Sequence, residues 1–186
     1  SFLNKKYYVS LLNAASFYGA SHQRAQTFSV MTEAPKLRNT VKTGTSILFF
    51  SKKNIPEKYI RSHKAQSGYV KVASPELTAI DLIENEKHIG GLNRVCTVLN
   101  ELVDSIDFDK LNKDFFDLAP TPIYQRLGYI LESVLEREDL ADIFKSKFPL
   151  SLTTRNVPFK IGKSTEDCEI DKKWKIIINQ EIEIDE

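Results

Sequence analysis

The spacing of apolar residues changes along the chain, and the first stretch has a helical period. Tyr7, Leu11 and Ala15 recur at intervals of about four residues, which is the pattern of one buried helix face. Gly19 stands where a left-handed residue commonly closes a helix. The pattern predicts an amphipathic helix that begins near Asn4 and ends at Gly19.

Strand-like patterns follow. Thr27–Thr32 and Thr45–Ser51 are rich in β-branched and aromatic residues, and the second is apolar on both faces, which favours a central strand. The basic stretch Lys52–Gly68 is predicted to be a loop with one short helix after Pro56. Tyr69–Ala73 alternates between apolar and polar residues, as a half-buried strand does.

The middle of the chain is predicted to be helical. Ser74 can cap a helix, Pro75 suits its first turn and Glu76 complements its positive end, so a helix should run to about Glu84. Gly90 and Gly91 interrupt the chain before the next helical stripe, which covers residues 92–103. Further helices are expected over residues 108–118, over 122–137 with Thr121 as N-cap, and over 139–148.

The last segment returns to a strand pattern. Val157–Ile161 and Trp174–Ile184 are β-rich, with a polar connection between them, and a terminal hairpin fits this arrangement. The predicted fold class is α+β: a mixed β-sheet, a helical middle region and a C-terminal β-hairpin. One domain over residues 1–186 is expected, with a basic sheet-forming half (1–75), a helical part (76–150) and the hairpin (151–186).

Composition supports a packed core and reveals an uneven charge distribution. The 186 residues are 41% hydrophobic, which suffices for one substantial core. The formal net charge is +1, but residues 1–75 hold 12 Lys or Arg against 2 acids, a net +10, and residues 76–186 hold 14 against 23, a net −9. Such asymmetry indicates a surface that faces a polyanion. Alternatively, the two halves neutralise each other where they meet.

Several classes of protein are disfavoured by what the sequence lacks. No apolar run approaches membrane-spanning length and no signal peptide is recognisable, so a cytoplasmic protein without membrane contact is expected. Cys96 and Cys168 have no partners at zinc-ligand spacing, which predicts two reduced thiols and no metal. Glycine-rich phosphate loops, a serine nucleophile elbow and paired metal-binding histidines are also absent. We expect neither a cofactor nor catalysis.

One enzymatic alternative is a metal-dependent nuclease, which would need clustered acidic residues to hold cations beside a phosphate. Glu76, Asp81, Glu181 and Glu183 are the candidates. A helix N-terminus explains Glu76, a solvated or salt-bridged helix face explains Asp81, and a half-exposed strand explains the last two. Cys96, on an apolar stripe, is interpreted as a core residue rather than a nucleophile.

Binding to nucleic acid has more support, because basic residues gather in the predicted loops and strand ends of the first half. Phosphate contacts need Lys and Arg on accessible segments. A diffuse set of this kind gives affinity with little sequence specificity, and a merely solvated surface is the alternative. The candidates for contacts with nucleic acid or with a toxin are Lys36, Arg38, Lys42, Lys52, Lys53, Lys58, Arg61 and Lys64.

Six motif blocks follow one another along the chain: Tyr7–Ala15 with Gly19–Gln23, Thr27–Thr32, Val72–Leu82, Gly90–Leu92, Val98–Leu102 and Gln125–Glu132. In content and in order, these blocks resemble the AbiEi antitoxin family. Most of the motif residues are expected to build the fold; His22, for example, is expected to fix the turn after the first helix. The motif residues are Tyr7, Tyr8, Gly19, His22, Gln23, Ser74, Pro75, Glu76, Asp81, Gly90, Gly91 and Arg126.

The resemblance implies the antitoxin of a bacterial type IV toxin–antitoxin system with a role in abortive infection against phage. Its partner would be a nucleotidyltransferase-like toxin, which such antitoxins often counteract without forming a stable complex. Relatives usually carry an N-terminal winged-helix domain that binds promoter DNA, and no such domain precedes Tyr7 here. A nuclease of degenerate motif and a stand-alone nucleic-acid-binding module remain the alternatives.

Overall fold

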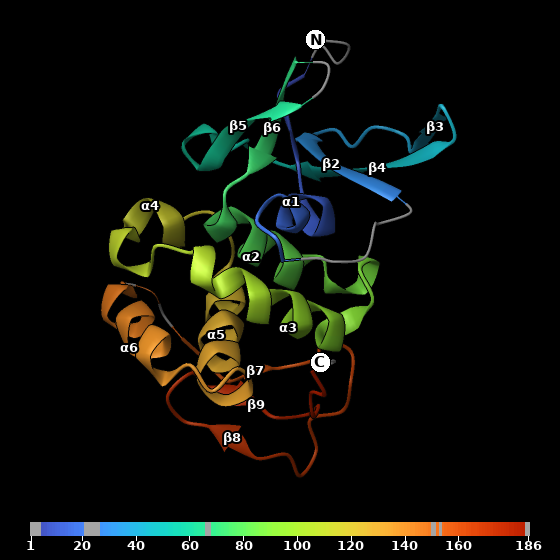
Figure 1. The fold of residues 1–186 in the computed structure, drawn as a ribbon. Helices are drawn as coiled ribbons and strands as arrows, with labels where there is room; N and C mark the ends of the chain where they lie inside the picture. Colours follow the sequence, from blue (N-terminus) through green and yellow to red (C-terminus); the bar gives the residue numbers. More distant parts are fainter. Residues whose placement is uncertain (1–4, 21–26, 66–67, 150–151, 153, 185–186) are drawn as a thin grey trace.

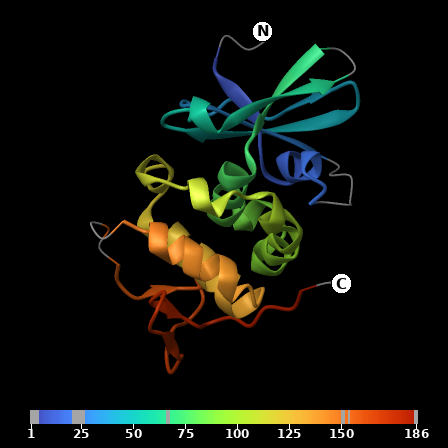
Figure 2. The same ribbon diagram turned by 60° about the vertical axis from the view of Figure 1, so that its left-hand side comes forward.

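The fold consists of two β-sheets with helices between them. The computed structural model describes residues 5–20, 27–65, 68–149, 152 and 154–184. Within this part of the chain, six strands form a mixed sheet in the order β3-β4-β2-β1-β6-β5, and three short strands form a second sheet in the order β7-β9-β8. The large sheet lies at one end of the molecule and the small sheet at the other (Figure 1; Figure 2 shows the same order from the side). The expected α+β class is confirmed.

Secondary structure covers most of the described residues. The strands are β1 (Tyr7–Val9), β2 (Thr27–Glu33), β3 (Thr40–Lys42), β4 (Thr45–Lys52), β5 (Ile60–Ala65), β6 (Gly68–Ala73), β7 (Val157–Pro158), β8 (Ile170–Asp171) and β9 (Ile176–Ile177). The α-helices are α1 (Leu11–Phe17), α2 (Pro75–Glu84), α3 (Gly91–Leu102), α4 (Lys113–Phe116), α5 (Thr121–Tyr129) and α6 (Glu138–Lys147). Shorter helical turns are η1 (Glu57–Tyr59), η2 (Glu86–His88), η3 (Val103–Ser105) and η4 (Phe108–Lys110), and η5 (Ile130–Val134) is a π-helical continuation of α5.

The first predicted helix is correct at its end and wrong at its start. Tyr7–Val9 is the strand β1, which pairs with β2 and β6, and the helix α1 begins only at Leu11, whose φ of 56° breaks the extended backbone. At the other end, Gly19 has a φ of 77° and its N–H donates to the carbonyl of Ser16. That is a left-handed helix closure, so the predicted end at Gly19 is confirmed.

The large sheet contains two further strands that the apolar pattern did not predict. β4 lies between β3 and β2, which confirms its expected central position. β3 and β5 are the edge strands: β3 lies between the first two predicted strands, and β5 lies in the stretch expected to be a loop. The helical turn after Pro56 is present as η1, but β5 follows it and pairs with β6 over six residues. An edge strand with exposed polar side chains leaves little hydrophobic signal.

The helical middle follows its local signals closely. The Ser74 hydroxyl accepts a hydrogen bond from the backbone N–H of Leu77 at 3.4 Å, and α2 ends at Glu84 as expected. Gly90, in the left-handed region, is the N-cap of α3, and Gly91, which also has a positive φ, is its first residue. Two expectations need correction: residues 108–118 form η4 and α4 rather than one helix, and the N-cap of α5 is Pro120 rather than Thr121. None of the helices in the described residues is long and apolar enough to cross a membrane.

The C-terminal strands pair differently from the expected hairpin. β7 and β9, which belong to the two predicted segments, are parallel to each other. The antiparallel partner of β9 is β8, in the stretch expected to be a polar connection. α5 holds this sheet in place: Arg126 donates to the carbonyls of Pro158 and Phe159, and Gln125 donates to that of Trp174.

Candidate nucleic-acid interface

The basic residues selected from the sequence lie at three separate places on the large sheet. One group is near β3, a second is on and before β5, and a third lies where β4 ends. Five strand spacings of about 4.8 Å separate the two edge strands, or about 24 Å. The residues therefore do not form one continuous patch. The β3 group is Lys36, Arg38 and Lys42, the β5 group is Lys58, Arg61 and Lys64, and Lys52 and Lys53 mark the end of β4.

Lys52 is engaged inside the molecule. Its Nζ lies 2.8 Å from Oδ1 of Asp81 and 3.0 Å from Oε2 of Glu84, and its side chain is 12% exposed. Burial opposes the charge, but the two carboxylates prevail and raise the pKa of Lys52 to about 12. The buried Tyr8 hydroxyl donates to Oδ2 of Asp81 at 2.8 Å. This cluster joins β1 and β4 to α2, so the charge of Lys52 is engaged within the fold.

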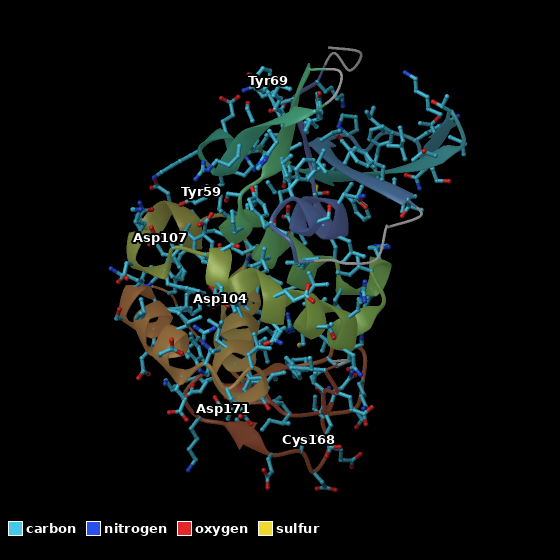
Figure 3. All side chains as sticks on the ribbon, viewed as in Figure 1. Tyr59, Tyr69, Asp104, Asp107, Cys168 and Asp171 are labelled. Atoms are coloured by element: carbon cyan, nitrogen blue, oxygen red, sulfur yellow. The ribbon has the colours of Figure 1, made fainter. Side chains whose placement is uncertain are left out.

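Lys58 is also paired with the acidic half of the chain. Its Nζ lies 2.7 Å from Oδ2 of Asp114, and the guanidinium of Arg61 donates to the carbonyl of Lys58 at 2.9 Å. Glu76 and Lys110 contribute to the same cleft of about 320 Å³, close to the labelled Tyr59 and Asp107 in Figure 3. Neutralisation between the two halves, the alternative interpretation of the charge asymmetry, therefore occurs at Lys52 and Lys58.

The six other basic candidates are exposed at the surface of the sheet half. They are Lys36, Arg38, Lys42, Lys53, Arg61 and Lys64. The sheet half itself supplies few acids, because Glu33 and Glu57 are the two acids among residues 1–75. This surface has the positive charge that attracts a polyanion.

The sheet also presents an apolar depression that sequence reasoning missed. It has a volume of about 410 Å³, and we call it the outer cleft. Its aromatic and aliphatic floor is formed by Tyr7, Phe28, Val30, Ile47 and Phe49. The alternation of Phe28 with Val30 and of Ile47 with Phe49 was the available signal, but assigning Tyr7 to a helix concealed that the third strand contributes to the same face.

Five of the described family-motif residues make side-chain contacts within the fold. Tyr8 and Asp81 belong to the buried Lys52 cluster, Ser74 caps α2, and Arg126 binds two backbone carbonyls. Glu76 lies in the first turn of α2, as expected, and its Oε1 accepts a hydrogen bond from the backbone N–H of Asp107. His22 and Gln23 lie outside the described residues.

The acidic residues considered for a nuclease do not converge. Asp81 is fully buried and its carboxylate is already bound by Tyr8 and Lys52, so it is salt-bridged rather than solvated. Glu181 and Glu183 line a depression with Cys168, which Figure 3 places at the opposite end from the large sheet. The described residues contain no group of three or more His, Cys, Asp or Glu side chains placed to hold a metal ion.

Comparison with known proteins gives a family and a fold. The family model of the AbiEi antitoxin C-terminal domain matches residues 8–133. The crystal structure of the RV2827C protein from Mycobacterium tuberculosis superposes with a TM-score of 0.62 at 14% identity; the match covers 91% of this chain and 61% of that one. A nucleotidyltransferase-like protein from Paracoccidioides brasiliensis gives a TM-score of 0.44 at 12% identity, over 78% of this chain and 87% of that one. No curated protein matches the sequence.

Proposed function

The chain belongs to the family of AbiEi antitoxin C-terminal domains, and from this membership we propose that it is the antitoxin part of a bacterial type IV toxin–antitoxin system. In this role it counteracts a nucleotidyltransferase-like toxin in the cytoplasm, with abortive infection of phage-infected cells as the outcome. The observation that carries the proposal is the family match over residues 8–133, which covers nearly all of the large sheet and the helices α1 to α5.

The antitoxin acts by binding rather than by catalysis. Supporting this, the acids that could have served a nuclease are dispersed or already paired, as at Asp81. Cys96 is fully buried on α3, and burial raises the pKa of its thiol to about 12, which makes it a poor nucleophile. The exposed part of the sheet half offers binding surfaces instead.

The exposed basic residues of the sheet half add to the affinity for promoter DNA. Their chemistry fits contacts with phosphates and not with base edges, because Lys53, Arg61 and Lys64 are exposed cations at a strand end and along an edge strand. Sequence recognition of the operator belongs to a winged-helix domain of the kind that relatives carry. This chain contributes the non-specific, electrostatic part of the affinity for DNA.

Two experiments test the two parts of the proposal. Co-expression with the product of the adjacent gene tests the antitoxin role: growth arrested by that product should be restored by this chain.

For the DNA role, the double charge reversal K53E/K64E should weaken duplex binding. It should also reduce the slope of log K against log salt by about 2, since each lost phosphate contact removes about 1. The matched control is K163E/K172E, which reverses two exposed lysines at the C-terminal end and should leave the slope unchanged. Equal slopes for wild type and K53E/K64E would reject the phosphate contacts.

A further inference from the structure

The outer cleft lies on the side of the large sheet that faces away from the helices. Neighbouring residues along a strand point to opposite faces. Tyr8 points toward α2, where its hydroxyl reaches Asp81, so Tyr7 points the other way. Val30 pairs with Phe49 and Phe28 pairs with Ile47, which places all four on the Tyr7 side.

The floor of the cleft is apolar and partly open. Phe49 and Val30 are each 6% exposed, and Tyr7, Phe28 and Ile47 are half-buried. Figures 1 and 2 show α1 and α2 on the other side of the sheet, and no described helix covers the cleft. The volume of about 410 Å³ falls within the range of pockets that hold small organic groups, roughly 300–1,000 Å³.

Two cations stand beside this floor. Arg38, from the segment between β2 and β3, and Lys42, at the end of β3, both line the cleft. They belong to the half of the chain that carries a net +10. A second copy of the chain that docked through this same face would bring like charges together. A polyanion with flat apolar groups matches both the charge and the floor.

We propose that the outer cleft binds unpaired nucleotides of a single-stranded nucleic acid. A base lies against the rings of Tyr7 and Phe28, and the phosphates beside it contact Arg38 and Lys42. Aromatic rings bind bases in this way irrespective of sequence, and cations beside them follow the backbone. In a duplex the base faces are stacked and hidden, so the floor of the cleft distinguishes single strands from the promoter duplex. The inference goes beyond the antitoxin role and does not depend on it.

The test measures binding of fluorescent 12-nucleotide oligo(dT) and oligo(U), and of a 12-base-pair duplex, by anisotropy at low salt. Tyr7→Leu keeps an apolar side chain and removes the ring. It should weaken single-strand binding by about 5- to 150-fold, the effect of losing one stacked base, and leave duplex binding within twofold. The matched control is Tyr69→Leu, the same change at a tyrosine that is 78% exposed on β6 and outside the cleft; it should change neither.

A second variant does not touch the apolar floor. R38Q/K42Q should reduce the salt slope of single-strand binding by about 1.4, since each phosphate contact contributes about 0.7. Thermal melting verifies that each variant is folded.

Three results would overturn the proposal. The first is the absence of single-strand binding at 100 μM protein. The second is an equal loss of single-strand affinity for Tyr7→Leu and Tyr69→Leu. The third is a dimer, seen in sedimentation velocity, that Tyr7→Leu abolishes. The last result would assign the cleft to a second copy of the chain. Rescue from the toxin is measured separately, so either proposal can fail alone.

Discussion

Gly128 on α5 packs directly against the ring of Trp174 in the C-terminal segment, and replacing it with alanine should destabilise the protein severely. A Cβ at Gly128 would lie under 3.0 Å from three ring carbons of Trp174, whereas ordinary contacts lie at 3.4–4 Å. The ring has little room to withdraw, because Trp174 is 1% exposed, stacks on Phe144 and donates its indole N–H to Glu132.

The magnitude follows from three contributions. Overpacking by one methyl group at a rigid ring costs about 3 kcal/mol. Displacement of the ring from Glu132 costs about 1.5 kcal/mol, the value of a hydrogen bond to a charged group. Alanine favours the helix over glycine by about 1 kcal/mol. We expect Gly128→Ala to lower the free energy of unfolding by about 3.5 kcal/mol.

Urea denaturation followed by far-UV circular dichroism measures this loss, and the double variant Gly128→Ala/Trp174→Leu is its control. Without the large ring, the added methyl group meets far less resistance, so the double variant should be nearly as stable as Trp174→Leu alone. The coupling between the two sites should exceed about 2 kcal/mol, within the range for residues in contact. A single variant Gly128→Ala within 0.5 kcal/mol of the wild type would refute the packing account.

Three further changes have defined outcomes. Lys52→Met leaves the buried carboxylate of Asp81 without its cation and should cost about 3–5 kcal/mol in urea denaturation. The pKa of Lys52 in the folded protein, about 12, exceeds its ordinary value of 10.5. The stability that its ion pair supplies is therefore complete below about pH 10.5 and is lost as the pH rises through 12. A difference in the free energy of unfolding between wild type and Lys52→Met that stays constant from pH 9 to 12 would contradict this. Tyr8→Phe removes a buried hydrogen bond to the same carboxylate and should cost about 1.5–3 kcal/mol, and a change below 0.5 kcal/mol would reject that bond as stabilising. A thiol reagent should label only Cys168 in the native protein and both cysteines in denaturant, since Cys96 is buried; rapid native labelling of Cys96 would contradict the packing of α3.

Sequence patterns predicted the elements whose signals are local. α2 has its cap, its proline and its acidic first turn within three residues, and β4 has an apolar run between polar ends. β1 was missed because three residues cannot establish an alternation and their spacing to Leu11 fits a helix. The parallel pairing of β7 with β9 joins segments about 19 residues apart, and no local signal specifies it.

The candidate site was less predictable than the fold. The positive charge of the first half can be counted from the sequence, but the count does not say which cations form ion pairs within the fold. The carboxylate partners of Lys52 and Lys58 lie on α2 and α4, 29 to 56 residues further along the chain. Only the packing of the sheet against the helices brings them together. The outer cleft likewise needs three strands in register before its floor exists.

Co-expression in bacteria with the product of the adjacent gene tests the antitoxin assignment most directly. Colony counts are compared with that product induced alone, together with this chain, and together with the destabilised variant Gly128→Ala at matched expression. The account predicts that the intact chain restores colony formation to the uninduced level and that the variant restores less. A toxic nucleotidyltransferase whose effect persists in the presence of folded, expressed chain would contradict it.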